Sequence, residues 1–142
     1  MSVLSPPDPA AVRPNPGRSP RRAGRGPAAV AAVLILLLIG GALGGVVRNG
    51  FVNYDDDLYI TANPELSRGP VIDGVRWAFT TTRGGNWHPL TWVSHLIDVR
   101  LFGLDPGAHH AVGLAIHAAN AVLLLALLLR RTGALWPSTL AA

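Results

Sequence analysis

The sequence predicts an all-α integral membrane protein, in which an extracytoplasmic loop with two short interfacial amphipathic helices joins two transmembrane helices. Two apolar runs carry this prediction. Residues 28–47 contain no charged side chain and would span roughly 30 Å as a helix, about the thickness of a bilayer core. Residues 111–129 form a second run of similar length, in which only His117 and Asn120 are polar. Of the 142 residues, too few remain outside these runs for a water-soluble core of ordinary size.

Residues 1–27 form a predicted disordered cytoplasmic tail, because they are rich in Pro, Arg, Gly and Ala and contain almost no large apolar residues. Basic residues flank the two apolar runs; they are Arg13, Arg18, Arg21, Arg22, Arg25, Arg130 and Arg131. By the positive-inside rule, both ends face the cytoplasm and residues 48–110 face outward across the plasma membrane. Topology explains the basic charge and no aromatic residues are interleaved with it, so no nucleic-acid partner is expected.

Cleavage of the first apolar run as a signal peptide is the alternative to a membrane span. The run is longer than the usual apolar region of a signal peptide, although Ala42-Leu43-Gly44 offers a small-residue cleavage site. We therefore predict a retained transmembrane helix over residues 28–47. The chain has no cysteine, which excludes disulfides and thiolate metal sites.

The segment of residues 48–110 is too long for a passive connection, and its helical periodicity predicts two helices. The first covers residues 71–79, and the second begins near Pro89 and ends at Gly103. Their apolar stripes are Val71, Val75, Ala78 and Phe79 in the first helix and Leu90, Val93, Ile97 and Leu101 in the second. Each helix carries a tryptophan, a residue that favours the bilayer interface, so we expect both helices to lie on the outer leaflet.

An acidic cluster, Asp55-Asp56-Asp57, lies a few residues beyond the first apolar run. Adjacent carboxylates repel one another, so such a run is solvated or is held by cations, a metal or hydrogen bonds. A general base, a metal ligand and a solvated acidic turn are the three interpretations that the cluster leaves open. Carboxylates held beside a membrane span point to chemistry at the membrane surface.

A second polar constellation covers residues 86–92, Asn-Trp-His-Pro-Leu-Thr-Trp, and its simplest interpretation is an interfacial anchor at the start of a helix. His88 and His95 lie two turns apart and could form a metal site together with Asp98 and the acidic cluster. That spacing lacks the close pairing of H-x-x-x-H sites, so we assign no metal ligand.

Histidines also mark the second apolar run. His109 and His110 open this run, and His117 falls two turns after His110. Polar groups inside a bilayer face other helices or a cavity, because lipid leaves them unsatisfied. Hydrogen bonding between helices and direct contact with a substrate are therefore the two interpretations.

Taken in order, residues 53–64, 77–79 and 86–91, then His110 and His117, carry a family resemblance. They resemble the start of membrane proteins that join a multi-span glycosyltransferase domain to tetratricopeptide repeats (TPR). These proteins belong to the polyprenol-phosphate-sugar-dependent (GT-C) superfamily, which includes protein O-mannosyltransferases. The resemblance covers roughly residues 28–142.

The resemblance implies transfer of a sugar from a lipid-linked polyprenyl-phosphate donor to a hydroxyl group of a protein or glycan acceptor. Asp55 would be the catalytic base and Asp56 would position the acceptor hydroxyl, whereas Asp57 has no assigned role. The acceptor oxygen attacks the anomeric carbon while the lipid phosphate leaves, in a single displacement. Arginine can hold a monophosphate leaving group, so neither a metal nor a cofactor is required.

On this resemblance we also assign substrate contacts to five residues, which are Tyr54, Trp87, His88, His110 and His117. One position departs from the family pattern, because eukaryotic members have an arginine where this chain has His88. The superfamily has many spans, so we expect an N-terminal fragment that is inactive alone, in which residues 130–142 form a cytoplasmic turn and the start of a third span. The alternative is a non-catalytic two-span membrane protein whose outer loop binds a partner or lipid headgroups.

Overall fold

The computed structural model describes residues 24–142, and within this range all regular structure is helical. The elements are α1 (Arg25–Leu43), η2 (Gly44–Arg48), η3 (Asp57–Thr61), η4 (Pro64–Leu66), α2 (Val71–Thr80), η5 (Arg83–Gly85), α3 (Pro89–Phe102), α4 (Pro106–Thr132) and α5 (Leu135–Ala141). The tail predicted to be disordered lies mostly outside the described residues. Its last three residues begin α1, so this helix starts ahead of the predicted position 28.

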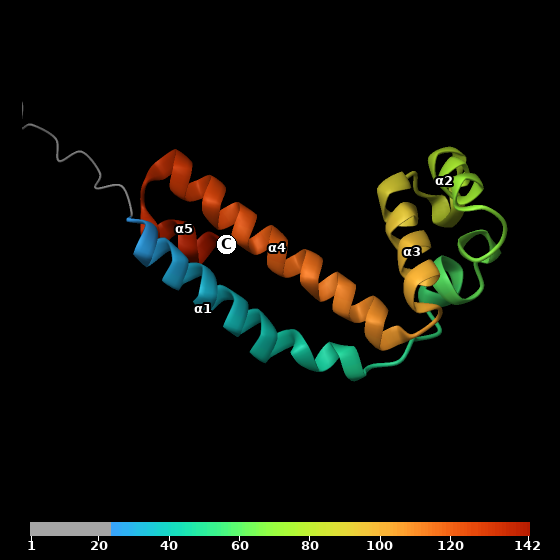
Figure 1. The fold of residues 1–142 in the computed structure, drawn as a ribbon, viewed down its shortest axis with the longest axis horizontal. Helices are drawn as coiled ribbons and strands as arrows, with labels where there is room; N and C mark the ends of the chain where they lie inside the picture. Colours follow the sequence, from blue (N-terminus) through green and yellow to red (C-terminus); the bar gives the residue numbers. More distant parts are fainter. Residues whose placement is uncertain (1–23) are drawn as a thin grey trace, which may run out of the picture.

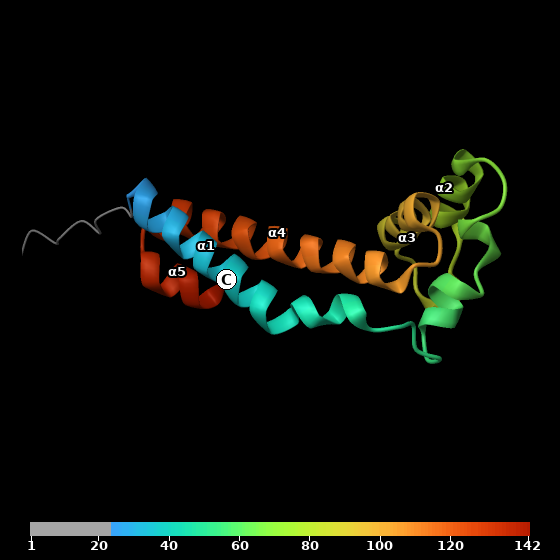
Figure 2. The same ribbon diagram turned by 60° about the horizontal axis from the view of Figure 1, so that its bottom comes forward.

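Two long helices form a hairpin that is apolar over most of its length. The first, α1 continued by η2, covers Arg25–Arg48, and the second is α4; both are long and apolar enough to cross a membrane by length and composition. They lie side by side in both views (Figures 1 and 2). Only 6% and 11% of their most apolar windows are buried, whereas the core helix of a soluble protein is mostly buried. We call α1, η2 and α4 the helical hairpin.

The second helix of the hairpin begins earlier than the predicted residue 111. Asp105 is its N-cap, since its Oδ1 accepts a hydrogen bond from the backbone N–H of Gly107 at 2.9 Å, and Pro106 occupies the first turn. His109 and His110, which the sequence places at the end of the connecting loop, therefore lie in the first turns of α4.

Residues 49–105, which we call the head region, gather at one end of the hairpin (Figure 1). The two helices predicted there are confirmed as α2 and α3, within one residue of the expected bounds. Gly103 ends α3 as predicted, in a conformation with φ of 65° that side chains with a Cβ rarely adopt. That these helices lie in the membrane interface stays a prediction.

A small hydrophobic core holds the head region together. Its buried members are Ile60, Leu66, Leu96 and Val99. Trp92 is 0% exposed, and its indole stacks on Tyr59 with ring centroids 4.9 Å apart. Gly74 lets α2 approach α3 closely, because a Cβ at this position would lie 3.0 Å from the Leu96 side chain. The indole of Trp92 is therefore part of the packed core of the head region and is not exposed on its surface.

The short helix α5 follows Gly133, whose left-handed conformation ends α4. It packs against both α1 and α4, at the end of the hairpin opposite the head region (Figure 2). This is the segment in which we expect a third span to begin, and that expectation stays a prediction.

Candidate functional site

A cavity of about 490 Å³ lies where the head region meets the start of α4. The residues that line it come from the segment after η2, from η3, from α3 and from the first turns of α4. They are Phe51, Asp56, Ile60, Leu90, Thr91, Ser94, His95, Asp98, His109, His110, Val112, Gly113 and Ile116. The wall therefore combines apolar side chains with two carboxylates and three imidazoles.

The elements η2 and α4 are in close contact next to the segment that leads into the cavity. A Cβ at Gly107 would lie only 2.8 Å from the backbone oxygen of Val47, so a larger residue would force these elements apart. Just beyond this contact, the ring of Phe51 meets the ring of His109 edge-on, with centroids 5.5 Å apart. The chain that leaves η2 is thus held against the histidines of α4.

The acidic cluster divides into one carboxylate that lines the cavity and two that do not. Asp56 lines it, and its Oδ2 accepts a hydrogen bond from the backbone N–H of Val52 at 2.8 Å. The Oδ1 of Asp57 accepts from the N–H of Leu58 at 2.7 Å, and Asp55 is exposed. Hydrogen bonds within the turn therefore hold two of the three carboxylates, as expected for adjacent anions.

A single turn of π-helix, η3, follows Asp56 and is held from outside by one arginine. The Nε of Arg83 donates to the backbone oxygen of Leu58 at 3.0 Å, and its Nη2 donates to that of Ala62 at 3.3 Å. Arg83 therefore fixes η3, the turn that directly follows the cavity-lining Asp56. π-Helical turns are rare in proteins, and those that occur are often found at functional sites.

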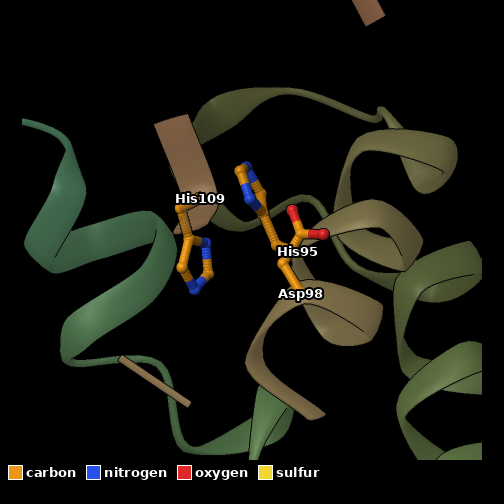
Figure 3. A group of neighbouring side chains, drawn as sticks. All are labelled: His95, Asp98 and His109. Carbon is orange, nitrogen blue, oxygen red and sulfur yellow. The ribbon is translucent and has the colours of Figure 1, made fainter. Parts of the chain in front are cut away.

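Three side chains of the cavity wall converge at one point. His95 and Asp98 come from α3 and His109 from the start of α4, and one ligand atom of each lies within 4.8 Å of the others (Figure 3). Burial lowers the pKa of His95 despite the nearby carboxylate of Asp98, and burial raises the pKa of Asp98 despite the two histidines. Both shifts favour the uncharged form of the side chain.

The ring of His109 is oriented by the turn between α3 and α4. Its Nε2 lies 2.9 Å from the backbone oxygen of Gly103, and a carbonyl oxygen only accepts, so Nε2 carries the proton. Its Nδ1 and the Nδ1 of His95 are both buried and find no hydrogen-bond partner within residues 24–142. Unpartnered buried nitrogens are costly, and each one calls for an explanation.

The predicted substrate contacts lie in different places. His110 lines the cavity, and its Nε2 is buried without a partner in the described part of the chain. His88 packs beside Trp92 with ring centroids 5.1 Å apart, within the aromatic part of the core. Tyr54 is 83% exposed, and Trp87 is also exposed and donates from Nε1 to the backbone oxygen of Phe79 at 3.0 Å.

The remaining predicted contact, His117, lies further along α4 and away from this cavity. It lines two smaller cavities of about 320 and 350 Å³ along the hairpin, one beside Leu43 and Val46 and the other beside Leu140. The structure therefore brings two of the predicted site residues, Asp56 and His110, to the large cavity, whereas His117 shares only the smaller cavity beside Leu43 with His110.

His109 is the member of the three-residue cluster that was not considered as a metal ligand from the sequence. The metal site considered from the sequence combined His88 and His95 with Asp98 and the acidic cluster, and no metal ligand was assigned. The structure pairs His95 and Asp98 with His109 instead. This pairing arises because the chain reverses between Gly103 and Pro106 and returns α4 against α3. The signal in the sequence was a histidine in the first turn after a helix-capping Asp-Pro-Gly element, which is too common to identify a site.

No protein-family model matches the chain, and comparisons with curated proteins and with solved structures found no match either.

Proposed function

We propose that this chain is the N-terminal part of a membrane glycosyltransferase that moves a sugar from a polyprenyl-phosphate donor to a hydroxyl acceptor. One observation carries the proposal beyond the sequence resemblance. The cavity that Asp56 and His110 line lies at the end of an apolar helical hairpin. A polyprenyl-phosphate donor likewise joins an apolar part to a polar part. Its tail belongs in the bilayer, and its phosphate and sugar belong at the bilayer surface.

The orientation of the hairpin is part of the same proposal. We infer that the hairpin spans the plasma membrane with Arg25, Arg130 and Arg131 on the cytoplasmic side and the head region outside. These arginines are at the start of α1 and the end of α4, which lie at the end of the hairpin away from the head region (Figure 1). This charge distribution follows the positive-inside rule.

The proposed reaction is a single displacement at the anomeric carbon. A carboxylate of the acidic cluster removes the proton of the acceptor hydroxyl, and the acceptor oxygen forms a bond to the anomeric carbon. The bond between that carbon and the phosphate oxygen breaks, and the lipid phosphate leaves with the electron pair. The carboxylate contributes as a positioned general base, an effect worth about 10²–10⁴-fold in rate.

The resemblance and the geometry favour different carboxylates for this role. The resemblance assigns the base to Asp55 and the positioning of the acceptor to Asp56. The geometry supports Asp56 as the base, because it lines the cavity whereas Asp55 is exposed. His110 adds a buried Nε2 that is free to hydrogen-bond a phosphate or hydroxyl oxygen entering the cavity.

The test measures sugar transfer by the full-length protein that the gene encodes. The protein is assayed in membrane vesicles supplied with a radiolabelled polyprenyl-phosphate sugar. Asp56→Asn keeps the size of the side chain and removes the base, so we expect transfer to fall by about 10²–10⁴-fold. Asp57→Asn is the matched control, because Asp57 belongs to the same cluster but does not line the cavity.

The same assay distinguishes a catalytic base at Asp55 from one at Asp56, and it also tests the glycosyltransferase proposal itself. Loss of transfer in Asp55→Asn with normal activity in Asp56→Asn would assign the base as the resemblance does. Normal transfer in both variants, with normal membrane insertion, would exclude the acidic cluster from catalysis. Absence of transfer by the unaltered full-length protein with every polyprenyl-phosphate sugar would contradict the glycosyltransferase proposal, whereas inactivity of this chain alone is already expected.

A non-catalytic membrane protein that binds lipid headgroups or a partner through its outer region is the second candidate. The observation that favours it is the apolar stripe of α3, on which Leu90 is 76% exposed and Ile97 and Leu101 are also exposed. An exposed apolar stripe of this kind marks an interaction surface. This candidate predicts that Asp55→Asn and Asp56→Asn leave every function of the protein unchanged.

A further inference from the structure

The polar side chains between α3 and α4 form a preorganised set of ligand atoms. His109 is 8% exposed, and its Nε2–H donates to the backbone oxygen of Gly103, which fixes both the tautomer and the direction of the ring. The neutral ring then carries a lone pair on Nδ1, which is buried and unpartnered within the described residues. A histidine that donates its other N–H to a backbone carbonyl is the usual arrangement at protein metal sites.

The other two members of the set come from one face of a single helix. His95 and Asp98 are three residues apart on α3, a spacing that brings side chains together on the helix surface. Asp98 is 6% exposed, and the only ion pair within residues 24–142 joins Arg76 and Asp73 elsewhere in the head region. A buried carboxylate beside two imidazoles and without an arginine or lysine partner lacks its usual compensation.

We propose that His95, Asp98 and His109 bind a divalent transition-metal ion, with zinc as the natural occupant and one coordination position open to the cavity. Two imidazoles and one carboxylate are a donor set that such ions prefer, and three protein ligands with a fourth position open are typical of catalytic zinc sites. All three residues line the cavity, so a small anion or a water molecule can reach the open position.

The distances between the ligand atoms fit this ion after a small side-chain rotation that brings the atoms closer together. Ligand atoms about 2.1 Å from a tetrahedral zinc ion lie about 3.4 Å apart. The three atoms now lie within 4.8 Å of one another, so side-chain rotation must bring them closer by at most about 1.4 Å. A bound cation also accounts for the two observations above, because it provides a partner for the buried Nδ1 of His109 and a positive charge beside the carboxyl group of Asp98.

This inference goes beyond the proposed sugar transfer, which needs no metal, and it does not depend on that reaction. Its test measures metal directly in the full chain, purified in detergent without a polyhistidine tag and dialysed against zinc and then against metal-free buffer. We expect about one zinc ion per chain by elemental analysis. His95→Ala, Asp98→Asn and His109→Ala should each weaken zinc binding by more than the roughly 10–100-fold that loss of an outer-shell partner costs.

Matched controls separate the site from ordinary surface binding. His117→Ala removes a histidine of the same helix that is not one of the three ligand residues, and Asp73→Asn removes an exposed carboxylate of the head region. Both variants should keep the zinc content of the unaltered chain. Equal zinc content in the ligand variants and the controls, or no zinc in the unaltered chain, would overturn the proposal.

A second measurement covers the case in which a ligand variant does not fold. X-ray absorption at the zinc edge of the unaltered chain reports the first-shell atoms and counts imidazole ligands without any substitution. Two imidazoles with oxygen in the remaining positions are expected, whereas a shell of oxygen alone would overturn the assignment. Because neither measurement uses sugar transfer, failure of the metal site and failure of the proposed reaction give different results.

Discussion

The helical hairpin and the head region differ in how much of their apolar surface is buried within the protein. In the hairpin, small fractions of the two apolar windows are buried, and large side chains such as Leu37, Leu38 and Leu123 are exposed. In the head region, α2, α3 and η4 bury a shared core around Trp92 and Leu96. The hairpin thus relies on its surroundings to cover its apolar surface, whereas the head region covers much of its own.

This difference indicates which kinds of substitution each region tolerates. In the proposed bilayer location almost any apolar side chain suits the surface of the hairpin, so we expect the hairpin to tolerate exchange among apolar residues and to be sensitive to charge. A packed core depends on shape, so the head region is sensitive to the loss of a single ring. The candidate site lies at the junction, where ligands from α3 in the head region meet a ligand from α4 in the hairpin.

The largest expected effect tests the head region as a packed unit. Trp92→Ala removes a fully buried ring that contacts Tyr59, Trp77 and His88, and such losses cost about 3–5 kcal/mol. We expect hydrogen exchange of α2 and α3 to accelerate, while exchange in α1 stays slow. The exposed Trp87 is the control, since Trp87→Ala removes one hydrogen bond worth about 0.5–1.5 kcal/mol. Equal protection in the two variants would show that the core does not depend on Trp92.

The next effect tests the hairpin as a membrane-spanning unit. Leu38→Arg places a charge near the middle of α1, on a side chain that is exposed, and a central arginine costs about 2.5–3.5 kcal/mol of insertion free energy. Leu101→Arg changes an exposed leucine of α3 and should leave insertion unaffected. Integration is measured by resistance of the protein to alkaline extraction from membranes. Unchanged integration of Leu38→Arg would mean that α1 does not span the bilayer.

The smallest effect on stability tests whether the exposed stripe of α3 touches lipid. The chain has no cysteine, so Leu90→Cys carries a single spin label at an exposed position, where the stability change should stay within about 0.5 kcal/mol. In nanodiscs, a label on the membrane surface collides more with oxygen than with a water-soluble nickel chelate. Asp73→Cys, on an exposed polar position of α2, is the control. The same collision ratio at both positions would place α3 away from the bilayer.

Several features of the fold were predictable because they depend on short-range physics. The two apolar runs, the helix from Pro89 and its end at Gly103 follow from hydropathy, from the fixed φ of proline and from the conformational freedom of glycine. The early start of α4 was missed, although Asp105 and Pro106 are standard helix-start residues, because the prediction followed hydropathy alone.

The buried side of α3 was less predictable. Apolar residues lie on two sides of this helix, and the pattern alone does not say which side packs inward. The structure buries Trp92, Leu96 and Val99 and leaves Leu90 and Leu101 exposed. The choice depends on α2 and η4, which reach α3 only after the chain has folded back through several turns.

The sequence by itself therefore determined the two apolar helices, the two short helices between them and the acidic cluster, since each depends on neighbouring residues along the chain. Only the tertiary structure decided which carboxylate of that cluster lines a cavity and which histidine joins His95 and Asp98. Both outcomes depend on contacts between α3, η2 and α4, and the close approach at Gly107 is one of them. Directions of side chains across such contacts are set by packing in three dimensions, which no local pattern of residues encodes.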